Sequence, residues 1–156
     1  MKTKLLVVGK TNDKNITKGI DDYVGRVKHY MPFDIEVIPE LKNTKSLTQS
    51  NQKEMEAEQI LKRLQPSDTV VLLDEHGKEF RSIEFARWIE KQQQTARSLV
   101  FIIGGPYGFA DSVYERSDAK LSLSKMTFSH QMIRLLFVEQ IYRACTIIKG
   151  EPYHHE

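Results

Sequence analysis

Short continuous apolar runs alternate with amphipathic segments along this chain of 156 residues. The runs at residues 5–8, 69–73 and 99–103 lack polar alternation, which is typical of strands that are covered on both faces. Residues 34–38 instead alternate with period two and predict a more exposed strand that ends at Pro39. In chain order, the predicted strands are residues 5–9, 34–38, 69–73, 99–103 and 120–123.

Helical spacing of apolar residues predicts the elements between these strands. We expect Ser82 to cap one helix, and Gly150 to end the last helix, with Pro152 beyond it. The predicted helices are residues 15–30, 52–64, a segment after Ser82, 111–115 and 130–149. Strand–helix alternation predicts one α/β domain over residues 1–156, with a mostly parallel sheet flanked by helices.

Ligands of such sheets bind outside the carboxyl ends of the strands, so the segments after Leu73, Ile103 and Leu123 are the first candidates for chemistry. Two nucleotide signatures are absent. Gly9-Lys-Thr resembles the end of a P-loop, but Lys4 stands where that motif needs glycine. The run Gly104-Gly-Pro-Tyr-Gly108 lacks the G-x-G-x-x-G order, so a nucleotide-dependent α/β enzyme is only a weak alternative.

Two of these segments suggest a ligand site. The adjacent glycines Gly104 and Gly105 allow close approach of a ligand to the main chain, or they form a tight strand–helix turn. In residues 121–130, hydroxyl side chains alternate with apolar ones, an arrangement that could clasp an adenine ring and bond its edge. The alternative is a strand followed by a helix that Ser129 caps.

The last helix is apolar around most of its circumference, so we expect it to be buried in the core or in a homodimer interface. Its Glu139 and Arg143 stand at i,i+4 and are expected to pair. The tail carries Tyr153, His154 and His155, and it is either a frayed terminus or a functional cluster. No further ligand set supports a metal site there.

Composition excludes several classes of protein. Apolar residues make up 40% and charged residues 28%, which is neither disordered nor membrane-like. Cys145 is the only cysteine, so we expect no disulfide, no cysteine-built metal site and a cytosolic location. The net charge is only +2, but residues 1–31 hold seven Lys or Arg against three Asp. This excess is either a solvated helix face or a contact for nucleic acid.

Four motifs in a fixed order closely resemble those of the ribosomal large-subunit methyltransferase H family, which belongs to the SPOUT class of knotted methyltransferases. They are Ile103-Gly-Gly-Pro-Tyr-Gly108, Leu121-Ser-Leu-Ser-Lys-Met-Thr-Phe-Ser-His130, Glu139-Gln-Ile-Tyr-Arg-Ala144 and Pro152-Tyr-His154. Ser129 departs from the family pattern, which commonly has proline there, and His155 stands where a basic residue is common.

The resemblance implies an S-adenosylmethionine-dependent homodimer with a C-terminal deep trefoil knot, and it implies neither metal nor membrane. Its implied substrate is a pseudouridine of 23S ribosomal RNA, methylated at N3 on the assembled ribosome. The positions that match the family's cofactor site, together with the adjacent Gly105, are Leu73, Gly104, Gly105, Leu123, Ser124, Lys125, Met126, Thr127 and Phe128.

Methylation at N3 requires loss of a proton, so we expect a general base or an electrostatic aid. Our catalytic candidates are His154, with Arg143 and Tyr153 orienting the base or a phosphate. The alternative is a non-catalytic, ribosome-associated RNA-binding protein on the same fold. The intact glycine turn and the run 123–128 argue against it.

Overall fold

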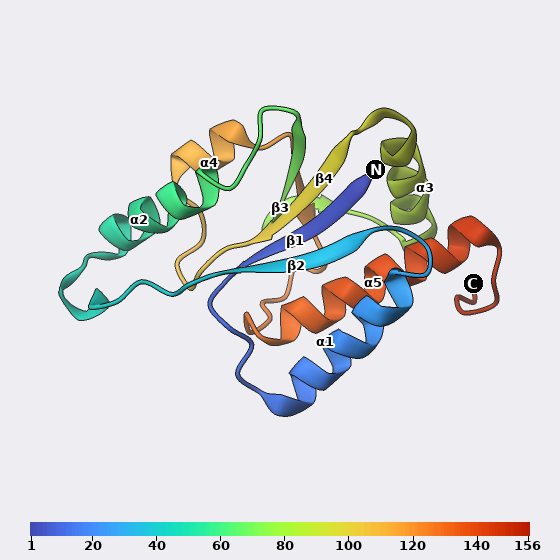
Figure 1. Ribbon diagram of the computed structural model, residues 1–156, viewed down its shortest axis with the longest axis horizontal. Coiled ribbons are helices and arrows are strands. Elements are labelled where there is room, and N and C mark those ends of the chain that lie inside the picture. Colours follow the sequence, from blue (N-terminus) through green and yellow to red (C-terminus); the bar gives the residue numbers. More distant parts are fainter.

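The computed structural model describes residues 1–156 as a single five-stranded sheet between two layers of helices (Figure 1). The elements in chain order are β1 (Lys2–Val8), α1 (Lys14–Val27), β2 (Phe33–Ile38), the 3-10 turn Thr44–Ser46, α2 (Gln49–Leu61), β3 (Asp68–Glu79), α3 (Ser82–Thr95), β4 (Ser98–Ile103), α4 (Asp111–Arg116), β5 (Ala119–Ser122) and α5 (Met132–Lys149).

All strand pairs are parallel, and the strand order is β2-β1-β4-β3-β5. The two apolar strands β1 and β4 lie next to each other inside the sheet, where Leu5 stands opposite both Ile35 and Phe101. Five consecutive residues of β4 are buried. The predicted α/β class, with a parallel sheet and buried inner strands, is confirmed. The trefoil knot that the resemblance implies stays a prediction.

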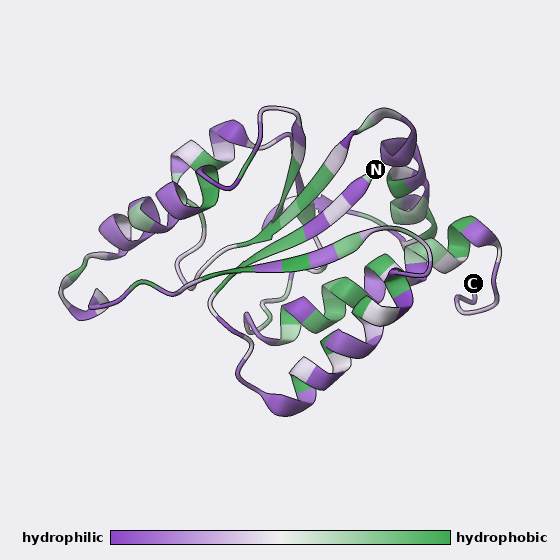
Figure 2. Ribbon diagram, viewed as in Figure 1, coloured by the Kyte–Doolittle hydropathy of each residue, from purple (hydrophilic) through white to green (hydrophobic).

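Each face of the sheet has its own apolar core, and Figure 2 shows hydrophobic residues on the helix sides that face the sheet. One core includes Phe101 and Phe137 and is covered by α1, α3 and α5. The other includes Leu72 and Ile102 and is covered by α2 and α4. No helix is both long enough and apolar enough to cross a membrane.

Several element ends differ from the sequence predictions: α1 ends at Val27 rather than residue 30, α2 is shifted to Gln49–Leu61, and three further differences have a local cause. Strand β3 continues past residue 73 to Glu79, with a shift in its pairing to β5 between Leu73 and Lys78. Helix α3 is capped by Arg81 rather than Ser82, because the Glu84 side chain accepts the Arg81 N–H at 2.7 Å and fixes the first turn one residue earlier. Helix α5 begins at Met132, whose N–H donates to the Ser129 hydroxyl at 3.1 Å.

The two edge strands are short or charged. Strand β5 has four residues. Strand β2 has six, lies between Pro32 and Pro39, and carries Asp34 and Glu36, of which Glu36 pairs with Lys4 of β1. Such edges discourage another strand from adding to the sheet.

Candidate functional site

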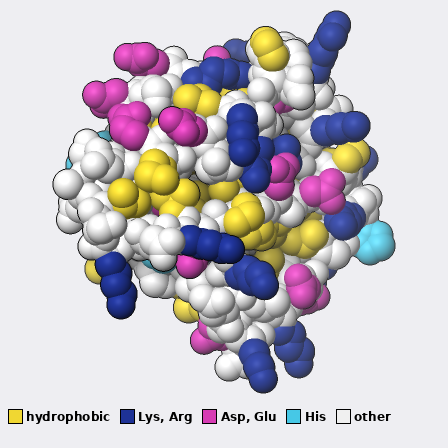
Figure 3. Space-filling model, turned by 60° about the vertical axis from the view of Figure 1, so that its left-hand side comes forward, with side chains coloured by type: hydrophobic (Ala, Val, Ile, Leu, Met, Phe, Trp, Pro, Cys, Tyr) yellow, Lys and Arg dark blue, Asp and Glu magenta, His cyan; other side chains and the backbone are white.

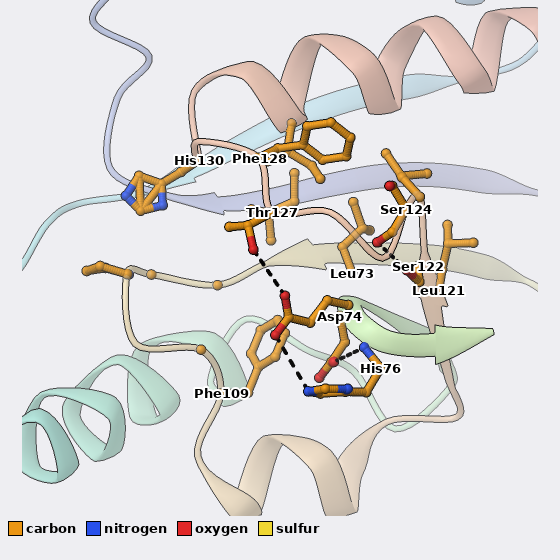
Figure 4. A pocket seen from close by; sticks show the side chains of 18 of the residues that line it. Leu73, Asp74, His76, Phe109, Leu121, Ser122, Ser124, Thr127, Phe128 and His130 are labelled. Atoms are coloured by element: carbon orange, nitrogen blue, oxygen red, sulfur yellow. Dashed lines mark hydrogen bonds and ion pairs between the residues drawn. The ribbon is translucent and has the colours of Figure 1, made fainter. Parts of the chain in front are cut away.

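A cavity of about 450 Å³ opens at the carboxyl edge of the sheet, where β4 and β5 end and where β3 shifts its pairing after Leu73 (Figure 4). Its volume lies in the range of small-molecule sites, and its position is where ligands bind parallel sheets. The lining residues are Leu73, Asp74, Glu75, His76, Ile103, Gly104, Gly105, Pro106, Tyr107, Gly108, Phe109, Tyr114, Leu121, Ser122, Leu123, Ser124, Met126, Thr127, Phe128, His130 and Ile133.

The structure brings eight of the nine predicted cofactor residues together in this wall: Leu73, Gly104, Gly105, Leu123, Ser124, Met126, Thr127 and Phe128. Lys125 does not line the cavity. Its side chain points to solvent, and its Nζ lies 3.9 Å from Glu79 Oε1. The irregular part of β3 after Leu73 and the loops after β4 and β5 therefore meet in one site.

Two serines shape the loop after β5 rather than facing a ligand with free hydroxyl groups. The Ser122 hydroxyl donates to the Ser124 carbonyl at 2.8 Å, and the Ser124 hydroxyl accepts the Met126 N–H at 3.0 Å. These bonds hold the loop in a turn, so its exposed N–H and C=O groups are pre-positioned for hydrogen bonding.

The sequence analysis missed an acidic group in the cavity wall, although it directly follows the Leu73 position. Asp74 accepts the His76 N–H at 2.8 Å and the hydroxyl of Tyr114 (Figure 4 shows Asp74 and His76). Burial alone would raise the pKa of Asp74, but these two hydrogen bonds bring it below its usual value. Burial, together with the bond to Asp74, raises the pKa of Tyr114 to about 12. The cavity therefore has a fixed negative charge on one wall.

The three predicted catalytic residues form a second cluster on α5 and the tail. Arg143 lies 3.0 Å from His154 Nδ1, and its other guanidinium nitrogen donates to Glu139 at 2.6 Å, which confirms the predicted Glu139–Arg143 pair. The Tyr153 hydroxyl donates to the same Glu139 oxygen at 2.9 Å. Burial, and then hydrogen bonds with Tyr23 and Glu139, raise the pKa of Tyr153 above its usual range.

The geometry of this cluster fixes the proton on His154. A guanidinium group only donates hydrogen bonds, so Nδ1 accepts and the ring proton lies on Nε2. That Nε2 is buried and forms no hydrogen bond, and Glu156 Oε1 lies 3.3 Å from it. His154 therefore lies between the Arg143 guanidinium at Nδ1 and the Glu156 carboxylate near Nε2.

The cluster lies apart from the cavity within one chain. None of Arg143, Tyr153 and His154 lines the cavity, whereas Ile133 in the first turn of α5 does. Ten residues of helix separate Ile133 from Arg143, which corresponds to about 15 Å along the axis and a different side of the helix. One copy of the chain therefore does not bring the two groups together.

No group of three or more His, Cys, Asp or Glu is arranged to hold a metal ion.

Residues 1–154 match a family model described as a predicted SPOUT methyltransferase. The chain belongs to the SPOUT methyltransferase family. Relatives named ribosomal RNA large subunit methyltransferase H are 65% identical in Bacteroides fragilis, 65% in Phocaeicola vulgatus and 51% in Flavobacterium psychrophilum, with 100% of each chain covered.

A SPOUT methyltransferase needs a methyl donor, and the cavity at the carboxyl edge is the part of this fold with the size and position for one. Apolar side chains such as Leu73, Phe109 and Ile133 offer surface for a flat ring, and the turned loops offer main-chain groups. The second cluster, with Arg143 at its centre, offers donors and a positive charge. The SPOUT methyltransferase thus has two chemically distinct groups at separate places.

Proposed function

We propose that this protein transfers a methyl group from S-adenosylmethionine to N3 of a pseudouridine in 23S ribosomal RNA of the assembled ribosome, in the cytoplasm. The observation that carries the proposal is full-length identity of 65% to relatives named ribosomal RNA large subunit methyltransferase H. The cavity at the carboxyl edge supports it, because the residues present fit the cofactor.

The fit rests on the shape and chemistry of the cavity. Its apolar wall suits an adenine ring, and the loop after β5 offers main-chain groups to the ring edge. The carboxylates of Asp74 and Glu75 suit a cofactor that carries a positive charge and ribose hydroxyls. Bound S-adenosylmethionine supplies an activated methyl group, so the protein mainly positions donor and acceptor.

The tail cluster supplies the electrostatic aid. As N3 loses its proton, negative charge develops on the base, and the Arg143 guanidinium and the His154 Nε2–H are donors that can stabilise it. Tyr153 and Glu139 hold Arg143 in place from the other side.

We propose that the enzyme works as a homodimer, in which the cavity of one chain faces the tail cluster of the other. The separation of Ile133 and Arg143 along α5 supports this, because both groups serve one reaction. Large hydrophobic side chains at the cavity mouth support it as well: Met126 is 77% exposed, and Tyr107 and Met132 are exposed too. On the face of the molecule drawn in Figure 3, hydrophobic side chains gather in the middle, with Lys, Arg, Asp and Glu around them.

Nucleoside mass spectrometry of ribosomal RNA tests the substrate. A deletion strain should lack the methylated pseudouridine, and complementation should restore it. An unchanged level of methylpseudouridine in the deletion strain contradicts the proposal. Calorimetry with S-adenosylmethionine distinguishes the proposed enzyme from a non-catalytic RNA-binding protein on this fold, because the latter would give neither heat nor a thermal shift.

A further inference from the structure

The N-terminal region carries exposed lysines that no acidic side chain pairs with. Of its cations, Lys4, Arg26 and Lys28 pair with Glu36, Asp22 and Asp34. The remaining ones are Lys2 at the start of β1 and three exposed lysines, Lys10, Lys14 and Lys18. None of these four takes part in an ion pair, so the regional excess of charge belongs to them.

The three lysines Lys10, Lys14 and Lys18 are here called the lysine row. Lys14 and Lys18 line a shallow depression of about 400 Å³, and Lys10 directly precedes its lining residue Thr11. Six side chains line it, and all are polar: Thr11, Asn12, Lys14, Thr17, Lys18 and Asp21. Lys14 and Lys18 stand one helical turn apart, about 6 Å along the axis of α1. Two acids lie near the row: Asp13 is engaged as the cap of α1, where it accepts two N–H groups at 2.9 and 3.0 Å, and Asp21 lines the depression.

Two side chains from the start of α5 hold the loop before α1 in place. Gln131 accepts the Asn12 N–H at 2.7 Å and donates to the Lys10 carbonyl at 3.1 Å. Arg134, which is 3% exposed, donates to the Val8 and Gly9 carbonyls and to the Thr11 hydroxyl, each at 2.9 Å. The loop is therefore pre-organised, and binding a ligand there costs little ordering of the main chain.

The same stretch of α5 places the lysine row next to the cavity. His130 and Ile133 line the cavity, and Gln131 and Arg134 alternate with them along the chain to hold the loop of Lys10. A polyanion that passes over the lysine row would reach the cavity mouth without leaving this end of the molecule.

We propose that the lysine row is a docking surface for the phosphate backbone of the RNA substrate beside the reacting nucleotide. This proposal rests on the proposed function, because the RNA is its substrate. Phosphate contacts fix register without reading sequence, and free lysine side chains on a rigid loop suit that role. A net charge of +2 is compatible with it, because the phosphate contacts are local.

Salt dependence of binding to purified bacterial 70S ribosomes is the sharpest test. We expect the triple variant Lys10→Gln, Lys14→Gln, Lys18→Gln to bind at least about 10-fold more weakly at 0.1 M salt. Its plot of log affinity against log salt should be shallower by about 2 to 3, and that of Lys18→Gln alone by about 1. Calorimetric affinity for S-adenosylmethionine should not change, because no lysine of the row lines the cavity.

The matched control removes the same charge elsewhere: Lys45→Gln, Lys62→Gln, Lys91→Gln, all exposed and outside any ion pair. We expect the control to keep the wild-type slope. The docking surface is overturned if wild type and the row variant have equal salt slopes, or if the row and control variants lose equal affinity. Methylation of ribosomes by the wild type would still uphold the proposed function in either case. Wild-type protein that neither binds nor methylates ribosomes overturns both.

Discussion

Gly105 in the cavity wall lies against the carboxylate of Glu56, which reaches it from α2. A Cβ on Gly105 would stand 2.5 Å from Glu56 Oε1, too close for any real contact. Glu56 is 5% exposed and accepts one side-chain hydrogen bond, from Gln52 at 3.3 Å. The sequence analysis leaves open whether the glycine serves close approach of a ligand or a tight turn, and the structure places Glu56 where a side chain would go.

We expect Gly105→Ala to weaken binding of S-adenosylmethionine at least about 10-fold, because the methyl group must push the turn or the buried carboxylate aside. Glu56→Ala in the same chain should recover part of the loss, since neighbouring substitutions do not add. Calorimetry on both variants measures this. Gly25→Ala is the control, because nothing lies within 4 Å of its Cβ position. Additive losses would contradict the contact.

Glu56 should make stability depend on pH. Burial raises the pKa of its carboxyl above the usual 4.5, so the folded state disfavours the ionised form. The resulting cost is absent below pH 4.5 and grows as the pH rises through the folded pKa. We expect Glu56→Gln to be more stable than wild type at pH 7, with the difference vanishing near pH 4. Urea unfolding at both pH values measures this difference in the free energy of unfolding. An equal difference at pH 4 and pH 7 would show that ionisation of Glu56 is not its cause.

We expect the buried Arg134 to contribute more to the free energy of unfolding than an exposed arginine does, because its side chain donates to three oxygens of residues 8–11. Arg134→Met leaves three oxygens without their donor, so we expect the free energy of unfolding to fall by about 3 kcal/mol. The exposed Arg87, which pairs with Glu90, is the control, and Arg87→Met should change it by about 0.5 kcal/mol or less. Chemical denaturation compares them. Equal effects would show that Arg134 does not anchor the loop.

Catalysis and cofactor binding should separate by residue. His154→Ala is expected to lower methyl transfer about 100-fold with unchanged affinity for S-adenosylmethionine, because His154 contacts Arg143 and not the cavity. His155→Ala is the neighbouring control and should retain activity. Single-turnover methylation with calorimetry gives both quantities. A fall in the affinity of His154→Ala for S-adenosylmethionine would contradict the assignment of His154 to catalysis rather than to cofactor binding.

Two inactive variants should complement each other if the site is shared between subunits. Gly105→Arg abolishes cofactor binding, because the side chain has no room beside Glu56, and His154→Ala removes the tail donor. Mixed dimers hold one intact pair of cavity and tail, so a co-refolded mixture should regain about a quarter of wild-type activity. An inactive mixture, or a monomer by sedimentation at micromolar concentration, would contradict the shared site.

Hydrophobic pattern predicts most of this fold because burial dominates it. The runs at 69–73 and 99–103 become inner strands, and the apolar helix 130–149 becomes α5 between α1 and α3. Local chemistry predicts less. The cap moves from Ser82 to Arg81 through a side chain three residues away, and β3 continues through a pairing shift that only its contact with β5 explains.

The candidate site divides in the same way. Glycines and hydroxyl residues after buried strands predict the cavity wall, since strand ends meet at one edge of a parallel sheet. In the sequence, nothing distinguishes Glu56 and Arg134 from exposed charged residues, and only the folded structure shows that both are buried. His154 lies away from the cavity because its partner Arg143 is several turns along α5 from Ile133 and on a different side of the helix. The sequence motifs do not show this separation.

The charged and shortened edges of the sheet limit how copies of this chain can associate. Asp34 and Glu36 on β2 and the four-residue β5 leave no long free strand for another sheet to extend. Two copies must therefore meet through helices and loops, the elements that carry Met126, Met132 and the tail. Addition of further copies at these edges is discouraged, so the homodimer proposed above has to form away from the edges of the sheet.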